Sequence, residues 1–167
     1  MKKIKSAKQL TPTEEALLQS EERYKAFISQ STEGIWRCEL EKPLSMKDPI
    51  KKQLAHIFKY GYLAECNDAM AQMYGYKKAA ELKNIRLKDI MVPTDEENSN
   101  YLTDFIKSNF KLQKRRSHER DKYGNSHIFE NNLIGIIENG YVLRAWGTQR
   151  DITEQIKANE RQEFWKK

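Results

Sequence analysis

The chain has 167 residues, of which 38% are hydrophobic and 32% charged, and its formal net charge is +6. This length supports one domain with a hydrophobic core, and the composition excludes a disordered segment. No apolar run approaches the roughly 20 residues that a membrane-spanning helix needs. The basic tail over residues 1–10 is not followed by the apolar segment of a secretory signal. We therefore expect a cytoplasmic protein without a membrane span.

Lysine and arginine residues concentrate in this tail and again at residues 111–116. Glu119 and Asp121 follow the second cluster closely, and neither cluster lies on a recognisable recognition helix. A nucleic-acid partner would rest on charge alone, and we expect none.

The first predicted element is a flanking helix over residues 11–30. Thr11 is a typical N-cap, Pro12 suits the first helical position, and Glu14 completes a capping box. The rest of the segment is strongly charged except for one stripe at helical spacing, formed by Leu17, Tyr24 and Ile28. A helix of this kind needs a partner, so we expect the protein to form a homodimer in which this stripe contacts a second copy of the chain. Gly34 is expected to end the helix.

Two strands and a long connection follow. In the first strand three apolar residues alternate with charged ones, namely Trp36, Cys38 and Leu40. The second strand is predicted over residues 62–66. Between them, residues 42–61 are predicted to form an insertion that covers one end of the sheet, and either lengthens a ligand pocket or supplies a partner surface.

The insertion is predicted to contain a helix. Asp48 is expected to cap it, Pro49 suits its first position, and Gly61 closes it. Its inward stripe consists of Ile50, Leu54, Ile57 and Phe58. We expect this stripe to pack against the domain.

Short helices are predicted after the second strand. Asn67 is a natural N-cap for residues 68–74, and Asn84 is a left-handed C-cap for residues 79–83. A longer helix is then expected to start at a capping box that begins with Thr94. Its apolar face is formed by Leu102, Phe105 and Ile106.

The last third of the chain predicts a three-stranded meander and a helix. The strands are expected at residues 111–121, 126–138 and 141–150. Gly124 and the Asn139-Gly140 pair are hairpin signals. Asp151 and Glu154 have capping-box spacing and predict a linker helix over residues 153–167. Together the elements predict an α+β fold with a five-stranded antiparallel sheet.

Several stretches in this order resemble the PAS family. They are Met73-Tyr74-Gly75-Tyr76 with Ala80-Glu81-Leu82, Lys88-Asp89-Ile90 with Pro93-Thr94-Asp95, the hairpin Asp121-Lys122-Tyr123-Gly124-Asn125, and the PAC-like exit Gly147-Thr148-Gln149-Arg150-Asp151-Ile152-Thr153-Glu154. The similarity covers residues 20–155. It implies a PAS domain over residues 31–152, with short helices on one face of the sheet and flanking helices at both ends.

The resemblance also implies a function. A PAS module detects a small molecule or a partner, dimerises, and relays the signal through its C-terminal helix. The output domain would be one such as the histidine kinase of a bacterial or archaeal two-component system. Asp151 and Thr153, where the last strand becomes the exit helix, are expected to couple the sheet to that helix. The alternative is a protein–protein interaction module with a filled core and no ligand.

The sequence shows no pattern of a catalytic or metal site. Its 3 histidines lack metal-ligand spacing, and neither a nucleophile elbow nor a phosphate-binding glycine loop is present. Cys38 and Cys66 have no C-x-x-C spacing and are expected to be buried free thiols. We expect no metal and no enzymatic activity in this chain. If the parent protein is an enzyme, we expect its catalysis to take place in an output domain.

Two prosthetic groups found in the family are disfavoured. Flavin-binding PAS domains carry a cysteine in an Asn-Cys-Arg-Phe-Leu-Gln-like helix, whereas Cys66 lies at a strand end within Glu-Cys-Asn-Asp. Haem-binding PAS domains take a histidine from the long helix, and residues 95–109 contain none. We expect no cofactor, while an unidentified small-molecule ligand is compatible with the sequence.

Six residues are expected to face the space between sheet and helices, either around a ligand or as plain packing: Trp36, Cys38, Met70, Met73, Phe105 and Trp146. The triplet Glu130-Asn131-Asn132 interrupts an apolar strand, so polar groups should point inward whichever way the strand alternates. Glu130 and Asn132 are therefore candidate ligand contacts. Their partner would be backbone, Arg144 on the next strand, or the ligand itself.

Overall fold

The computed structural model describes residues 8–166, so most of the predicted basic tail lies outside the described residues. The chain divides into two compact units, one up to Ser31 and one from Thr32 onward. Among the described residues, no helix combines the length and apolar character that crossing a membrane requires.

The first unit contains the helix α1, Pro12–Gln30. Its predicted capping box is confirmed. The Thr11 hydroxyl accepts a hydrogen bond from the Glu14 N–H at 3.2 Å, and the Glu14 carboxylate accepts one from the Thr11 N–H at 2.8 Å. The prediction that Gly34 ends the helix is wrong, because Ser31 already turns into extended backbone and donates its N–H to the Ile28 carbonyl.

The second unit is built on a five-stranded antiparallel sheet in the order β2-β1-β5-β4-β3, which confirms the predicted α+β fold. The strands are β1 (Gly34–Ser45), β2 (Gly61–Cys66), β3 (Lys111–Arg120), β4 (Ser126–Glu138) and β5 (Tyr141–Asp151). Two of the hairpin predictions are confirmed by positive φ angles, 82° at Gly124, and 51° and 80° at Asn139 and Gly140.

The first strand is longer than predicted. After a register shift beyond Glu39, β1 pairs with β5 again, and Leu44 lies opposite Val142 and is fully buried. The stretch from Lys42 was predicted as a polar connection because Lys42, Ser45, Lys47 and Asp48 dominate it. A bulged strand does not keep the strict alternation by which strands are recognised.

Helix α2 (Ile50–Tyr60) forms where a helix was expected in the connection between the first two strands. Its predicted apolar stripe packs against the core, with Ile57 buried and the other three members partly buried. Asp48 does not cap it, contrary to prediction. Pro49 occupies the N-cap position, and the Asp48 carboxylate pairs with Lys52 at 3.3 Å.

The remaining helices are α3 (Asp68–Met73), α4 (Ala79–Leu82), α5 (Leu87–Ile90) and α6 (Glu96–Lys107). The Asn67 side chain accepts the Met70 N–H at 3.0 Å, and Asn84 has a φ of 67°, as predicted. The capping box at Thr94 is wrong by one residue. Asp95 is the N-cap and accepts hydrogen bonds from two N–H groups of the first turn, in line with the preference for aspartate over threonine at that position.

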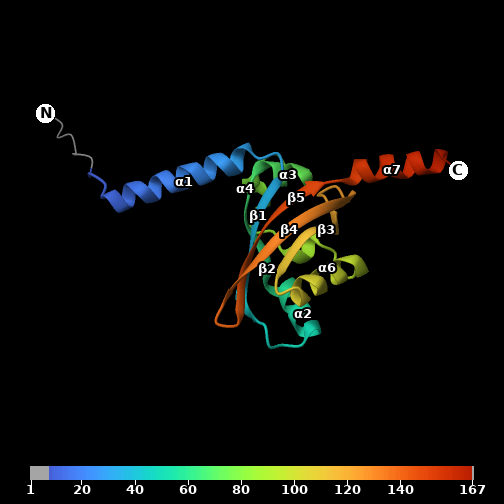
Figure 1. The fold of residues 1–167 in the computed structure, drawn as a ribbon, viewed down its shortest axis with the longest axis horizontal. Helices are drawn as coiled ribbons and strands as arrows, with labels where there is room; N and C mark the ends of the chain where they lie inside the picture. The colour runs from blue at the N-terminus through green and yellow to red at the C-terminus, as the bar shows by residue number, and fades with distance from the viewer. Residues whose placement is uncertain (1–7, 167) are drawn as a thin grey trace. The chain divides into compact units, whose positions relative to one another are not determined.

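Helices α2 to α6 lie on one face of the sheet, as predicted, and the hydrophobic core fills the space between (Figure 1). The core receives residues from the helices, such as Met70, Leu82 and Phe105, and from the sheet, such as Leu63 and Phe129. The last strand runs directly into α7 (Thr153–Trp165).

Candidate functional site

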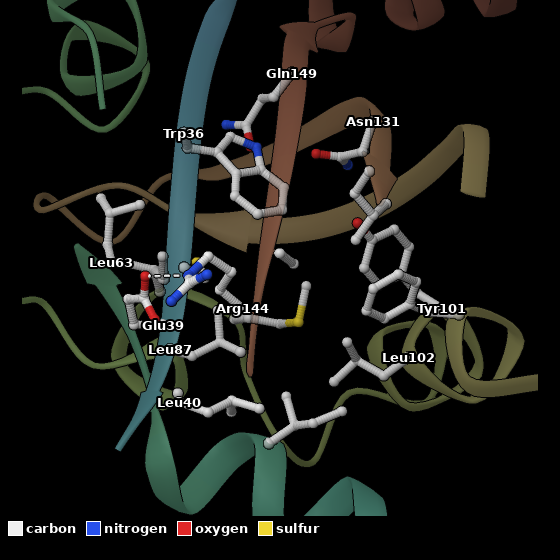
Figure 2. A pocket seen from close by; sticks show the side chains of 18 of the residues that line it. Trp36, Glu39, Leu40, Leu63, Leu87, Tyr101, Leu102, Asn131, Arg144 and Gln149 are labelled. Atoms are coloured by element: carbon white, nitrogen blue, oxygen red, sulfur yellow. Dashed lines mark hydrogen bonds and ion pairs between the residues drawn. The ribbon is translucent and has the colours of Figure 1, made fainter. Parts of the chain in front are cut away.

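A cavity of about 80 Å³ lies within this core, between the sheet and the helices. Most of its walls are apolar, and their larger members include Leu63, Met70, Leu87, Leu102, Phe105 and Leu133. Figure 2 shows that Trp36, Asn131 and Gln149 lie toward one end of the cavity and Leu40, Leu87 and Leu102 toward the other. Glu39 and Arg144 lie beside Leu87 in the same view, so polar side chains occur in both regions of the cavity wall (Figure 2).

Trp36 forms part of the cavity wall. Its side chain lies against β5 at Gly147, where an added Cβ would come within 2.3 Å of the indole ring. Glycine is thus required there by the close approach of the ring. Trp36 is 8% exposed, and its Nε1–H is buried without a hydrogen-bond partner among the described residues. An indole nitrogen can only donate, so this group is suited to a hydrogen-bond acceptor.

Five buried polar residues form a network beside Trp36. The Tyr74 hydroxyl donates to the Glu119 carboxylate, which also accepts the Ser117 hydroxyl at 2.8 Å. Gln149 donates to the Tyr74 oxygen at 3.2 Å, and Asn131 donates to the Ser117 oxygen at 2.8 Å. The members come from α3's end and from three strands, so the network ties the helical layer to the sheet.

The network has no cation within it. Burial raises the pKa of Glu119 above its usual 4.5, against the hydrogen bonds from Tyr74 and Ser117, which lower it. Burial and then the nearby Glu119 raise the pKa of Tyr74 well above 10. Both groups therefore favour their protonated forms, as expected for ionisable groups in a low-dielectric core.

The two cysteines are free thiols, as predicted. Burial raises the pKa of Cys38 to about 12 and that of Cys66 to about 11. Because the thiolate is the reactive form, neither is poised as a nucleophile. Cys38 lines the cavity, whereas Cys66 lies at the end of β2 with its sulfur toward the Ala79 carbonyl.

Five of the predicted site residues line the cavity, namely Trp36, Cys38, Met70, Phe105 and Arg144. Arg144 is not the partner of the β4 triplet, since its guanidinium pairs with Glu39 on β1 at 2.7 Å. Met73 lies outside the cavity wall, where its sulfur accepts a hydrogen bond from Gln149 at 3.8 Å.

Three predicted site residues point to the opposite face of the sheet, so their assignment to the interior is wrong. Trp146 lies under the Arg37 guanidinium, 5.5 Å from the ring centre to the guanidinium carbon. Glu130 pairs with Arg150 at 2.9 Å, and Asn132 donates to the Thr148 hydroxyl at 3.3 Å.

Sequence reasoning missed Asn131, the middle member of the triplet. It is 2% exposed and lines the cavity. β4 carries apolar residues on both faces, so alternation alone did not select one. One signal was present in the sequence: Phe129 and Leu133 lie two residues before and after Asn131, so all three side chains point to the same face of the strand. Ser117, Glu119 and Gln149 were also missed. They lie among other polar residues in their strands, so the sequence pattern does not distinguish their buried side chains from exposed ones.

The junction between β5 and α7 forms a second polar cluster. The predicted capping box of Asp151 with Glu154 is absent, since Ile152 occupies the N-cap position and Asp151 is the last residue of β5. The Asp151 carboxylate instead accepts the Thr153 N–H at 3.0 Å and its hydroxyl at 2.6 Å. The Thr153 oxygen accepts the Ile128 N–H of β4 at 2.9 Å, which fixes the start of α7 to the sheet.

His127 joins this junction to the β3–β4 turn. Its Nδ1 lies 2.9 Å from Asp151 and its Nε2 2.9 Å from Asp121, whose carboxylate also accepts the N–H groups of Tyr123 and Asn125. Only the protonated imidazole can donate to both carboxylates. Desolvation lowers the pKa of His127, but the bonds to the two aspartates outweigh it and raise that pKa above 6.5.

The two aspartates respond in the opposite direction. Partial burial raises the pKa of Asp121, but the hydrogen bonds from His127 and from the turn outweigh it and lower the value to about 2. The pKa of Asp151 is likewise lowered, because the bonds from Thr153 and His127 exceed the effect of its burial. The junction is therefore a charged cluster at mildly acidic pH, where the imidazole is protonated and the two aspartates are ionised.

Residues 54–154 match the sequence model of a family described as PAS domain. The chain belongs to the PAS domain family. PAS domains are generally sensory modules without catalytic activity. No curated protein matches the sequence.

Solved structures agree with this family. A PAS domain of a Colwellia psychrerythraea protein has a TM-score of 0.57 at 20% identity, over 81% of this chain and 98% of its own. A PAS domain of a two-component sensor histidine kinase has a TM-score of 0.53 at 17% identity, over 80% and 99%. An RNA-binding Light-Oxygen-Voltage receptor has a TM-score of 0.61 at 17% identity, over 97% of this chain and 41% of its own. At these identities the likeness is one of fold.

Proposed function

We propose that this PAS domain is a sensory input module that binds a small molecule in its cavity and relays binding through β5 and α7 to an output domain such as a histidine kinase. The observation that carries the proposal is the cavity itself, whose wall combines apolar residues with the buried polar side chains of Asn131 and Gln149.

The path to α7 is short. Gln149 lines the cavity and lies two residues before Asp151, the last residue of β5. From there, Asp151 holds Thr153 at the first position of α7, and the Ile152 N–H donates to the Ile128 carbonyl at 3.0 Å. In this proposal a displacement of β5 moves the start of α7. Residues 31–152 are then the sensory domain, with Asp151 and Thr153 as its signal exit.

Xenon is a suitable probe, because it occupies apolar cavities whatever hydrogen-bonding groups their natural ligand uses. We expect xenon pressure to shift NMR signals of cavity-lining methyl groups and to change amide exchange in α7 severalfold. Cavity shifts without any response in α7 would contradict the relay.

The exit role can be separated from simple stabilisation with one pair of variants. Asp151→Ala should keep the cavity response to xenon and abolish the response of α7. Asp104→Ala is the matched control, because it removes a carboxylate from a surface pair with Arg115. If α7 still follows xenon in the first variant, Asp151 has only a stabilising role.

The second candidate function is an interaction module without a ligand. Its support is the size of the cavity, about 80 Å³, which is well below the roughly 300–1,000 Å³ of typical ligand pockets. Absence of cavity shifts under xenon pressure would favour this candidate over the sensory one.

We propose that the cavity holds no flavin. Light-Oxygen-Voltage domains are among the similar structures, one of them studied with a flavin analogue at 12% identity and a TM-score of 0.53. A flavin carries three fused rings and needs a pocket of the usual ligand size, several times the about 80 Å³ present here. The residues therefore favour neither flavin nor, since α6 contains no histidine, haem ligated from that helix.

The connection between the first two strands contributes to the same cavity. Leu44, Ile57 and Gly61 all lie on its wall. We assign residues 42–61 a role in extending the cavity wall, which corresponds to the first of the two roles expected for this insertion, the lengthening of a ligand pocket.

Dimerisation is the remaining part of the proposal, with a second copy of α1 as the partner. Leu17 and Tyr24 of the predicted stripe are 61% and 39% exposed on that helix. Exposed apolar stripes commonly mark association sites. Leu17→Glu should convert a dimer to monomer in sedimentation velocity, whereas Glu15→Lys, an exposed charge change on the same helix, should not. A dimer that survives both Leu17→Glu and deletion of residues 1–30 would contradict this interface.

A further inference from the structure

We propose that the cavity takes a small uncharged primary amide with a short alkyl chain. Its two N–H groups donate to the side-chain oxygens of Asn131 and Gln149, and its carbonyl accepts the Tyr101 hydroxyl. This inference rests on the proposed function, because it assumes that the cavity holds a ligand. It adds the chemical class of that ligand and the residues that recognise it.

Asn131 of β4 and Gln149 of β5 are neighbouring polar side chains in the cavity wall. The antiparallel register places them directly opposite each other, and both line the cavity. The side chains of such a pair leave the same face of the sheet, with their Cβ atoms about 5 Å apart. A single head group of a ligand can therefore reach both side chains.

The orientation of the two amides follows from the atoms around their nitrogens. The Asn131 Nδ2 lies 3.4 Å from the Arg115 carbonyl oxygen and 3.5 Å from that of Phe129. The Gln149 Nε2 lies 3.8 Å from the Met73 sulfur. Carbonyl oxygens and a thioether sulfur only accept hydrogen bonds, so the NH₂ group of each side chain faces these atoms. The oxygen of each amide is thereby turned the other way.

These two oxygens are accessible from the cavity. Neither Asn131 Oδ1 nor Gln149 Oε1 has a hydrogen-bond partner among the described residues, and neither is completely covered by protein atoms, as the unpaired Trp36 Nε1 is. Each residue is only 2% exposed and lines the cavity, so the accessible surface of its oxygen faces the cavity. Figure 2 shows the Asn131 oxygen directed toward the side on which Gln149 lies.

Tyr101 of α6 supplies a donor to the same cavity. It lines the wall and is 3% exposed, and its hydroxyl has no hydrogen-bond partner in the part of the chain described and is not completely covered. A hydroxyl can donate, whereas the amide oxygens of Asn131 and Gln149 can only accept. A ligand that matches all three groups has two N–H donors and one acceptor. This is the hydrogen-bonding pattern of a primary amide.

The absence of a net charge on the ligand follows from the ionisable groups of the wall. Arg144 already pairs with Glu39 at 2.7 Å, so an anion would have to compete with that carboxylate. The other carboxyl of the wall is Glu119, whose pKa is raised by burial, so it favours the neutral form and is a poor counter-ion for a cation. An unpaired charge in a largely apolar space is costly.

The size of the ligand follows from the volume of the cavity. At about 10–15 Å³ for each water-sized occupant, the cavity of about 80 Å³ holds roughly five to eight such units. A primary amide with an alkyl chain of about three carbons is in this range. Met70, Leu102 and Phe105 in the wall provide apolar contacts for that chain.

Four probes of the same shape test these points. Butanamide has the proposed head group. In 2-pentanone a methyl group replaces the NH₂, butanoate is the anionic analogue, and butanamidine is the cationic one. Titrations of the full chain at pH 7 would be followed by the side-chain carbonyl ¹³C signals of Asn131 and Gln149. We expect butanamide to bind about tenfold or more tightly than each of the others, and to shift both signals further than 2-pentanone does.

Variants assign the two acceptors. Gln149→Met keeps the length of the side chain and removes its oxygen, so it should reduce the preference for butanamide over 2-pentanone about tenfold. Asn131→Leu, which is similar in shape, should do the same. Asn132→Leu is the matched control and should preserve the preference, because Asn132 donates to Thr148 on the opposite face of the sheet.

Tyr101→Phe tests the donor separately. Butanamide and 2-pentanone both have a carbonyl that would accept the hydroxyl, so loss of the hydroxyl should weaken both about tenfold and leave their ratio unchanged. A change in the ratio, or unchanged affinities, would contradict the role of Tyr101.

The inference is overturned if butanamide does not bind, if 2-pentanone binds as tightly, or if the preference survives both Gln149→Met and Asn131→Leu. Tighter binding of butanoate or butanamidine would overturn the uncharged class. The comparison of the four probes uses the unaltered chain, so it decides even if a variant does not fold. These outcomes are distinct from failure of the proposed function, which shows under xenon as absent cavity shifts or as cavity shifts without a response in α7.

Discussion

The buried network and the exit junction lie next to each other at one end of β3, β4 and β5. Glu119 of β3 and Gln149 of β5 belong to the network, whereas Asp121, which follows β3, forms the junction with His127 of β4 and Asp151 of β5. Burial raises the pKa of Glu119, whereas hydrogen bonds lower the pKa of Asp121 and Asp151. Glu119 and Asp121, only two residues apart in the sequence, thus differ in the form that they favour: Glu119 favours the protonated form, whereas Asp121, like Asp151, favours the ionised form.

The carboxyl groups of the network and of the junction differ in their pKa shifts because they differ in solvent exposure and in the presence of a neighbouring cation. Glu119 is 6% exposed and has hydroxyl donors only, so desolvation dominates its behaviour. His127 supplies a positive charge at the junction and its side chain is 22% exposed, so desolvation there is weaker than the pairing. The buried network is therefore suited to positioning neutral hydrogen-bonding groups, and the junction to responding to charge.

Asn131→Asp should have the largest effect, because it places a second carboxyl in the buried network with no cation to compensate it. We expect a loss of about 3–5 kcal/mol in the free energy of unfolding at pH 8. Much of this should return at pH 5, where one of the two carboxyls can be protonated. Urea denaturation at both pH values measures it.

Asn132→Asp is the matched control for that prediction, since its side chain lies on the other face of the same strand. It should cost less than about 1 kcal/mol at either pH. Similar losses in the two variants would contradict the difference in burial between neighbouring residues.

Tyr74→Phe should cost about 2 kcal/mol, because it removes a donor to Glu119 and the oxygen that accepts from Gln149. Tyr123→Phe, at a residue that is 70% exposed, should be nearly neutral. Thermal and urea unfolding of both variants would measure the difference. Equal stabilities would show that the network carries little free energy.

Glu119→Gln should change how stability depends on pH, by less than the loss in Tyr74→Phe. A carboxyl whose folded pKa is raised above 4.5 stabilises the fold below pH 4.5, and this contribution is lost as pH rises through the folded value. The variant should therefore gain stability relative to wild type between pH 4 and pH 8. A constant difference over that range would mean that Glu119 does not titrate with folding.

His127→Gln should have the smallest effect, below about 1 kcal/mol, because the pair is partly exposed. The raised pKa of His127 gives stability below pH 6.5 that is lost as pH rises through the folded value. The lowered pKa values of the aspartates give stability above pH 3.8 that is lost on acidification. The loss should thus be greatest between about pH 4 and 6.5, and amide exchange at the start of α7 should follow it.

The control for the junction is His56→Gln on α2, whose imidazole contacts the Lys42 carbonyl away from any carboxylate in the part of the chain described. It should not alter exchange in α7 at pH 5.5. A His127 variant with the same loss at pH 5.5 and pH 8.5 would show that the histidine acts through packing against Phe129 instead of through charge.

Local patterns in the sequence determined the order of the elements, the caps at Thr11 and Asn67, the turn at Asn139, and the resemblance to the PAS family. These features depend on residues that are close together in the sequence, so they can be predicted from the sequence alone. Spacing also placed Trp36, Met70 and Phe105 correctly on the inner side, because apolar residues there recur at the period of their helix or strand.

Only the tertiary structure decided which polar residues are buried. Glu119 and Ser117 lie on a strand whose other residues are mostly charged, and they become internal because helix α6 packs on that strand and Tyr74, at the end of α3, bonds to Glu119. Asn131 was one of three candidates in β4, and Trp146 was assigned to the wrong face of β5, since apolar residues occur on both faces of these strands. The environment of a buried polar side chain is set by contacts between residues far apart in sequence, such as Tyr74 with Glu119. The periodicity of a single helix or strand cannot predict such contacts.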